Sequence, residues 1–212
     1  MTDTTVTTKK EIAYNMLRAS IIEGKISKRV PISVQFLSKQ LHMSVAPIRD
    51  ALHQLSFEGF ITIVPGKGVY VNELSFSEAQ ELYEFIIYIE QIIFKNIINL
   101  LTDEDFQALD NLLKKQKKCM ESSDYYSFMK ANSEFHFYFH DKYYNKTICN
   151  HDKLIRDRIF QASLDSIKKP GRLMQSFQQH VAILEALKDK NLLRANQIIE
   201  SHIYEGLSFA LR

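Results

Sequence analysis

The feature that most restricts how this chain can fold is a pair of short helical patterns separated by a tight connection. Ser33 is a typical N-cap residue and predicts the start of a short helix, and residues 42–43 form the connection. Ser44 then predicts a second helix over residues 44–57. The apolar side chains of this second helix recur at helical spacing and form one inward face: Ile48, Ala51, Leu52 and Leu55.

A β-hairpin is expected directly after these helices. Residues 60–64 and 69–71 are β-rich and flank the turn sequence Pro-Gly-Lys-Gly at 65–68. A further helix is expected before them, over residues 9–23, and its apolar face is formed by Ile12, Met16, Ala19 and Ile22. Three helices followed by a hairpin form the winged helix-turn-helix pattern, whose second short helix can enter the major groove of DNA.

The rest of the chain has the pattern of an all-helical bundle. Only 6 Gly and 4 Pro occur in 212 residues, so few breakers interrupt the apolar periodicity. A linker at 73–77, with Ser77 as the next N-cap, predicts one domain at 1–74 and a second at 75–212, and the fold class is therefore mainly α. Helices are expected near 77–100, 103–121, 124–142, 147–167, 173–189 and 191–210.

Composition excludes several classes of protein. Hydrophobic residues make up 45% of the chain, which is typical of a globular protein rather than a disordered one. The only two cysteines, Cys119 and Cys149, lie far apart and form no CxxC motif, so we expect no disulfide framework and a reducing, cytoplasmic location. The apolar stretch 85–101 is broken by Glu90 and Lys95, which predicts a buried helix and no membrane span.

Charge and side-chain type point to a DNA-binding surface in the first domain. The net charge is only +2, but residues 1–74 carry nine Lys/Arg against six Asp/Glu. The outward face of the 44–57 helix carries Val45, Ala46, Arg49, Asp50 and His53. Arg49 is its only cation and can read guanine, although an ordinary surface arginine would give the same pattern. Ser44 and the first amides of the helix can hold a phosphate.

The residues from Leu37 through Gly59, with the later run Pro-Gly-Lys-Gly-Val-Tyr-Val, resemble the signature of the GntR family of bacterial regulators. The resemblance implies a dimeric, ligand-responsive repressor that binds a pseudo-palindromic operator in double-stranded DNA. It also implies DNA contacts from Ser44, Arg49 and Gly68. Val45 and Ala46 lie on the same outward face of the helix as Arg49, Lys67 at the hairpin tip can reach the minor groove or the backbone, and Arg18 is a further phosphate candidate. Val45 and Ala46 replace the Arg-Thr pair common in the family, so the operator sequence is expected to differ. His53 lies farther along the helix and is expected to be a surface residue.

Three histidines of the second domain lie within predicted helices beside apolar residues. They are His136, His180 and His202, and Asn132 lies one turn before His136. Three imidazoles and one side-chain oxygen meeting inside a bundle would suit Zn, Ni or another divalent first-row ion. The spacing leaves two alternatives open: His140 is as near to His136 as Asn132 is, and isolated histidines of this kind are often hydrogen-bonded core residues.

The helical part resembles the FCD type of ligand-binding domain found in the FadR branch of the GntR family. The resemblance rests on Asn132 with His136, on the helix that His180 opens, and on His202 in the final helix. It implies a metal held by these four residues and an organic-acid effector that completes the shell. Ile86 stands where relatives carry an arginine, which leaves Arg156, Arg158 and Arg172 as possible effector-binding substitutes, although a surface position explains each of them better.

Two other functions fit parts of the sequence. A metal-free regulator could bind an organic effector in an apolar pocket lined by the Phe and Ile residues of the bundle. A metal-dependent hydrolase would need a general base beside the histidines, but the chain has no HExxH motif, and Glu134 and His136 point in different directions on a helix. We therefore expect a regulator and not an enzyme.

Overall fold

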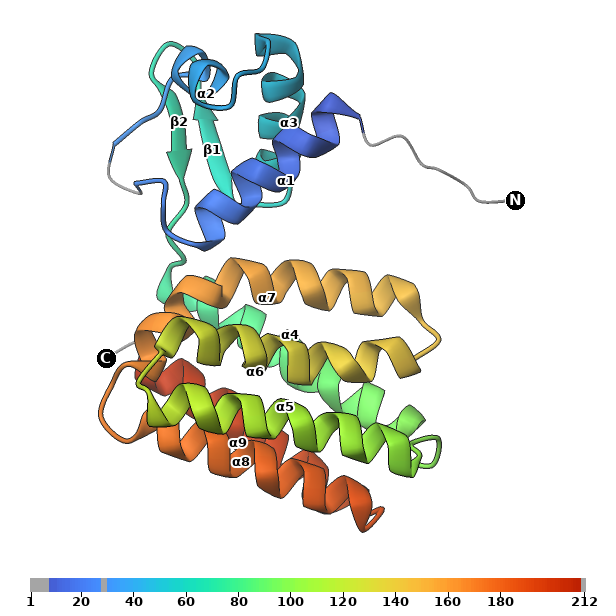
Figure 1. Cartoon of the computed structure of the whole chain (residues 1–212). Helices are drawn as coiled ribbons and strands as arrows, with labels where there is room; N and C mark the ends of the chain where they lie inside the picture. The colour runs from blue at the N-terminus through green and yellow to red at the C-terminus, as the bar shows by residue number, and fades with distance from the viewer. Residues whose placement is uncertain (1–7, 28–29, 211–212) are drawn as a thin grey trace. The chain divides into compact units, whose positions relative to one another are not determined.

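The computed structural model describes residues 8–27 and 30–210, which fall into two compact units that meet between Leu74 and Ser75 (Figure 1). The mainly α fold class is confirmed. The first unit contains α1 (Lys9–Ile22), α2 (Val34–Gln40), α3 (Val45–Phe57), β1 (Ile61–Val64) and β2 (Gly68–Val71). The second contains α4 (Phe76–Ile97), α5 (Asp103–Glu121), α6 (Tyr125–Lys142), α7 (Lys146–Ile167), α8 (Arg172–Lys188) and α9 (Leu192–Ala210).

The first unit packs its helices and its hairpin around the inward face of α3. The predicted face of this helix is confirmed, because its buried residues are Ile48, Ala51, Leu52 and Leu55. Strands β1 and β2 pair antiparallel with Ile61 opposite Val71, and an isolated bridge from Ile32 to Val69 extends the pairing. This is the winged helix-turn-helix arrangement that the order of elements predicts.

The predicted inward face of α1 is wrong. Ala13, Leu17 and Ile21 are the buried residues, whereas Ile12 and Met16 are 39% and 44% exposed. Both faces of this helix carry apolar side chains, so periodicity alone could not choose between them. The choice is made by packing against α3, which buries the small Ala13 side chain completely.

Gly68, the first residue of β2, has a backbone conformation that favours glycine. Its φ is +115°, and a Cβ built there would lie 3.0 Å from the carbonyl oxygen of Ile32. We therefore expect Gly68→Ala to lower the free energy of unfolding by about 1–3 kcal/mol, as measured by urea denaturation of the full chain. Gly66→Ala is the matched control, because Gly66 has a φ of +74° but open space around it. An equal loss in both variants would contradict a role for the Ile32 contact.

The second unit is a bundle of six described helices around an aromatic core. Phe94 of α4 meets Phe139 of α6 edge to face, with ring centroids 5.2 Å apart, and Phe135 packs against the same Phe139 ring. Helix α9 packs against α4, α7 and α8, while α5 packs against α6 and α8. This packing places one helix turn of each of α6, α8 and α9 in the interior, where the predicted histidines lie.

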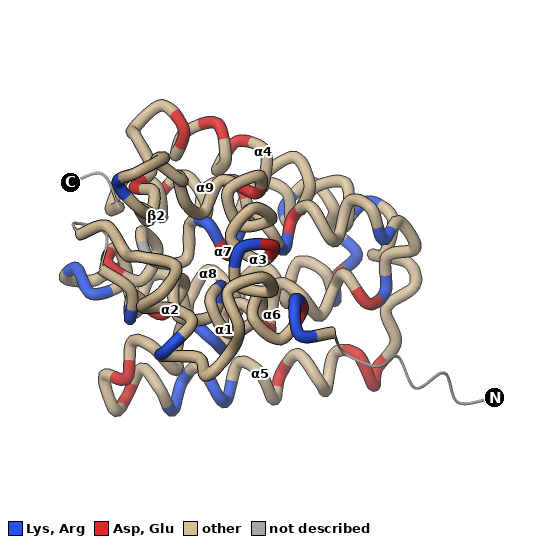
Figure 2. The backbone as a smooth tube through the Cα atoms, turned by 90° about the horizontal axis from the view of Figure 1, so that it is seen from above, with Lys and Arg blue, Asp and Glu red and all other residues tan. Residues whose placement is uncertain are grey.

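Capping and charge account for the ends and surfaces of these helices. The N-cap of α4 lies two residues earlier than predicted, at Ser75 rather than Ser77, because Ser75 and Glu78 form a reciprocal capping box. Acidic and basic residues both occur along α5, as Figure 2 shows. Among the described residues, no helix is long and apolar enough to cross a membrane.

Candidate DNA-recognition surface and buried histidine site

The N-terminal end of α3 is open to solvent. Arg49 is exposed and forms no ion pair with a described residue, and Ala46 beside it is also exposed. Ser44 occupies the N-cap position, but its side chain makes no capping hydrogen bond, which corrects the expectation that its hydroxyl caps the helix. The hydroxyl and the first amides of α3 are therefore available to a phosphate. His53 is exposed, as expected for a surface residue.

The other predicted DNA contacts occupy different environments. Lys67 is exposed at the tip of the hairpin, next to Gly68. The guanidinium of Arg18 lies over the rings of Tyr14 and Phe60, 5.8 Å and 5.9 Å from their centroids. Arg18 is thus partly engaged in packing its own unit, whereas Arg49 and Lys67 extend into solvent.

The three predicted histidines of the bundle meet in the interior. His136, His180 and His202 are 1%, 0% and 7% exposed, and their candidate ligand atoms all lie within 4.8 Å of one another. They come from α6, α8 and α9, which are separate segments of the chain. Residues this far apart in sequence converge because the helices that carry them pack side by side.

Each of these rings has an oxygen beside its Nδ1 atom. Nδ1 of His180 lies 2.7 Å from Oε1 of Gln116, and Nδ1 of His202 lies 3.0 Å from Oε1 of Gln179. Nδ1 of His136 lies 2.8 Å from a carboxylate oxygen of Glu90. For His180 and His202 this oxygen is a hydrogen-bond partner, which fixes the tautomer of the ring and leaves its Nε2 atom as the ligand. The contact of His136 with Glu90 does not have hydrogen-bond geometry.

The orientations of the two glutamine amides support this assignment. The Gln116 amide nitrogen donates to the carbonyl of Ala131, and the Gln179 amide nitrogen donates to Glu205. Their oxygens therefore face His180 and His202 and accept the Nδ1 protons of those rings. None of these three outer residues is among the sequence-predicted ligands. Glu90 is the only one with a visible signal, since it interrupts an apolar run.

The result is a set of nitrogen lone pairs that face one another. Nε2 of His180 and Nε2 of His202 are only 3.3 Å apart, and with both Nδ1 atoms protonated neither Nε2 carries a hydrogen to share. Burial lowers the pKa of all three histidines well below 6.5, so the rings stay neutral at physiological pH. Neutral imidazole nitrogens in this arrangement fit a divalent cation, and the donor set suits Zn or Ni.

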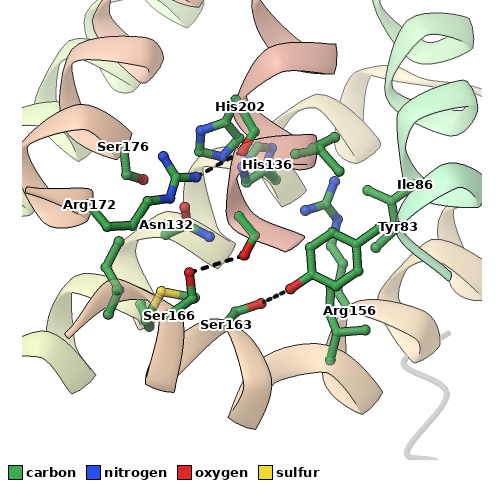
Figure 3. Close-up of a pocket in the computed structure, with 15 residues that line it drawn as sticks. Tyr83, Ile86, Asn132, His136, Arg156, Ser163, Ser166, Arg172, Ser176 and His202 are labelled. Carbon is green, nitrogen blue, oxygen red and sulfur yellow. Dashed lines mark hydrogen bonds between the residues drawn. The ribbon is translucent and has the colours of Figure 1, made fainter. Parts of the chain in front are cut away.

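A cavity lies beside these rings, and Figure 3 shows the side chains that line it. Asn132 lines it together with His136 and His202. His140 does not: its Nε2 lies 2.9 Å from Asp152, and its side chain borders a separate pocket. Of the two alternatives that helical spacing left open, the structure brings Asn132 and not His140 to the site.

Two of the three candidate effector-binding arginines reach this cavity. Arg156 and Arg172 both line it, and Arg172 is 3% exposed, so the alternative that they are surface residues is wrong. Arg158 does not line the cavity. Ile86 lines the cavity from α4, at the position where the FCD resemblance implies an arginine.

A series of buried charges connects His136 with His140 and includes Arg156 in the cavity wall. Arg156 contacts Glu90 and donates from Nε to Asp152 over 2.7 Å, and Asp152 in turn faces His140. Burial raises the pKa of Glu90 to about 7, and contact with Arg156 opposes the rise. Interaction with Arg156 and His140 lowers the pKa of Asp152 despite its burial.

These pKa shifts predict how stability depends on pH. In metal-free protein the three histidines stay neutral when folded, but they take up protons in the unfolded chain as pH falls through about 6.5. The free energy of unfolding therefore decreases on acidification, by at most about 1.4 kcal/mol per pH unit for each proton. Glu90 offsets one of the three protons, because the folded chain holds a proton on it up to about pH 7.

The measurement is urea unfolding of chelator-treated protein at about pH 7 and about pH 5.5. We expect a lower midpoint at the acidic pH, and a smaller decrease in a His202→Gln variant, which cannot titrate at that position. A midpoint that is unchanged or higher at the acidic pH would contradict the lowered pKa values.

Comparison with known families assigns both units. The family model described as "Bacterial regulatory proteins, gntR family" matches residues 9–71, and the FCD domain model matches residues 81–205. Relatives over most of the chain carry regulator names. "HTH-type transcriptional repressor RspR" of Escherichia coli K12 is 24% identical over 91% of this chain and 84% of its own length. The "Nta operon transcriptional regulator" of Aminobacter aminovorans is 29% identical over 79% of this chain and 78% of its own length.

Solved structures show the same fold. E. coli McbR/YncC superposes with a TM-score of 0.84 at 19% identity, covering 97% of this chain and 98% of that chain. A putative GntR regulator from Rhodococcus sp. RHA1 superposes with a TM-score of 0.79 at 17% identity, covering 96% and 97%. The families and relatives are transcriptional regulators rather than enzymes, so the hydrolase alternative is wrong. The chain belongs to the GntR family: it is a DNA-binding transcriptional regulator with an FCD domain.

Proposed function

We propose that this chain is a cytoplasmic repressor of the FadR branch that releases its operator when an effector binds in the helical unit. The observation that carries the DNA-binding part is the open end of α3. There Arg49 is exposed and has no ion pair with any described residue, and the Ser44 hydroxyl makes no capping hydrogen bond. In this assignment residues 1–74 read DNA and residues 75–212 bind the effector and form the dimer. A repressor name among the relatives supports the sign of regulation.

A homodimer would present two α3 helices to the half-sites of a pseudo-palindrome about one helical turn apart. An apolar stripe on α4 supports dimer formation by the helical unit. Phe85, Tyr88 and Ile92 lie at helical spacing and are 40%, 58% and 40% exposed. Exposed large apolar residues that cluster in this way favour a protein partner, and a second copy of the chain fits the symmetry of the operator.

The helical unit would hold a divalent Zn or Ni ion on the three Nε2 atoms of His136, His180 and His202. Asn132 supplies a side-chain oxygen from the same wall. A bound ion would relieve the repulsion between the Nε2 lone pairs of His180 and His202. It would also act as a Lewis acid toward an anionic ligand. An incomplete protein shell leaves coordination positions for that ligand. The cavity is lined by several polar and charged side chains, which favours a polar effector over the metal-free apolar alternative.

Two measurements test this function separately. Plasma mass spectrometry of untagged protein, purified without chelator, should find about one Zn or Ni ion per protomer. Selection from random duplex DNA should recover an inverted repeat whose affinity falls steeply with salt. Protein that stays metal-free after addition of Zn or Ni would overturn the metal site and leave DNA binding intact. Recovery of no common sequence would overturn the operator proposal.

A further inference from the structure

The first turn of α3 presents an apolar tip formed by its first three residues, Val45, Ala46 and Pro47. None of the three has a hydrogen-bonding atom in its side chain. Ala46 is exposed, whereas Val45 and Pro47 are half-buried. The side chains of this apolar tip can therefore contact a base only through apolar packing, and Ala46 is the one most open to such a contact.

Ala46 is the first member of the exposed row along α3. Arg49, Asp50 and His53 follow it at three, four and seven residues, and all of them are exposed. These spacings place the four side chains on one face of the helix. Arg49 is the only arginine or lysine in this row, so the side chain that can read guanine lies one turn from the apolar tip.

Only one base offers an apolar group to a side chain like Ala46. In the major groove, guanine, cytosine and adenine present hydrogen-bond donors and acceptors, while thymine adds a C5 methyl group. Alanine is among the side chains that pack against this methyl group. Another base in the same place would lose water from a polar edge without gaining a partner, which disfavours binding. The apolar tip therefore favours thymine and also excludes the other bases.

Helix geometry limits where this thymine can lie. Three residues of an α-helix span about 4.5 Å, and stacked base pairs are about 3.4 Å apart. A base that contacts Ala46 is then within about two base pairs of the guanine that Arg49 would read.

We propose that Ala46 reads the C5 methyl group of a thymine within about two base pairs of the guanine read by Arg49, in each half-site of the operator. The inference rests on the proposed function in taking α3 as the helix that enters the major groove. It adds a base that the arginine alone does not determine. It also states how the operator differs from those implied by the Arg-Thr pair common in the GntR family: an apolar contact replaces a hydrogen-bonding one.

Uracil in place of thymine tests the assignment, because the two bases differ only in the C5 methyl group. Full-length protein is titrated by fluorescence anisotropy against the selected inverted repeat, and against duplexes with uracil at one thymine position of both half-sites. Loss of one buried methyl group corresponds to about a fourfold loss of affinity, so substitution in both half-sites should weaken binding by about 15-fold. Ala46→Gly, which lacks the methyl group on the protein side, should bind the thymine and uracil duplexes equally.

Two matched controls make the test specific to Ala46. 7-Deazaguanine lacks the N7 acceptor, so at the guanine position it should weaken the parent and Ala46→Gly to the same extent, because Arg49 is intact in both. Val45→Ala changes the neighbouring apolar side chain and should keep the uracil effect. Circular dichroism checks whether Ala46→Gly folds. If it does not, Ala46→Ser takes its place, since serine is well tolerated at the start of a helix and its hydroxyl should remove the preference for thymine over uracil.

Three outcomes would overturn the proposal: an inverted repeat with no thymine near the guanine, affinity that uracil leaves unchanged at every such thymine, or a uracil effect of equal size in the parent and in the Ala46 variant. Each of these results would leave the proposed operator binding intact, because an inverted repeat has been recovered. Recovery of no common sequence would instead overturn both proposals.

Discussion

His180→Ala is expected to abolish metal binding. His180 supplies one of three buried Nε2 atoms, and its ring packs against the rings of both His136 and His202. Alanine at this position would leave only the nitrogens of His136 and His202 and would create a cavity where the ring had been. Loss of an outer partner alone lowers metal affinity by about 10- to 100-fold, and loss of a direct ligand exceeds that range. Plasma mass spectrometry of the untagged variant should find no stoichiometric metal, and competition with a chromophoric chelator gives the change in Kd.

Two control variants make this test specific. Gln116→Leu removes the oxygen that accepts the Nδ1 proton of His180, so its affinity should fall by about 10- to 100-fold without complete loss. His140→Ala removes a buried histidine that pairs with Asp152 away from the cavity, and its metal content should match that of the parent. Equal metal content in His180→Ala and in the parent would rule out the three-histidine site.

Arg49→Ala is expected to remove most sequence-specific DNA binding. A bidentate contact from arginine to guanine is worth about 1–3 kcal/mol of discrimination, and a symmetric dimer makes it twice. The preference for the selected operator over random DNA should therefore fall by about 2–6 kcal/mol, or roughly 30- to 20,000-fold, in fluorescence anisotropy titrations. Binding to random DNA should change little, because phosphate contacts supply it.

Lys67→Ala is the matched control for this experiment. Lys67 lies at the exposed hairpin tip, so its loss should weaken binding to all sequences about equally and reduce the salt slope by about one unit per contact. His53→Ala, on the same face of α3 but farther along, should have little effect on either quantity. If Arg49→Ala kept the full preference for the operator, base reading would have to be assigned to other residues.

The first unit shows what local pattern can and cannot predict. The inward face of α3 is predictable because its apolar residues occur on one side only. The face of α1 is not, because Ile12 and Met16 compete with Ala13 and Leu17, and only packing against α3 decides. Residue type places Ser44 at an N-cap, but whether its hydroxyl bonds to the helix depends on the backbone geometry of the turn.

The convergence of the three histidines was predictable from the sequence, and the residues that surround them were not. His136, His180 and His202 lie on apolar helix faces, and the FCD resemblance selects them from seven histidines. Gln116 and Gln179 carry no comparable signal, since glutamines are common on helix surfaces. The burial of Arg172 depends on α8 and α9 packing together, which no spacing within one helix reveals.

The amide oxygen of Gln179 accepts from both Arg172 and His202, over 2.9 Å and 3.0 Å. This shared acceptor joins an arginine that lines the cavity to one of the three rings that would hold the proposed ion. An anion that draws Arg172 toward itself would weaken the hydrogen bond from Arg172 to Gln179 and strengthen the one from His202 to Gln179. The His202 ring would then be a better electron donor. The two equilibria are then thermodynamically linked, and each must raise the affinity of the other by the same factor. If the helical unit binds both an ion and an effector as proposed, the supply of the ion would also change the effector concentration at which the regulator responds.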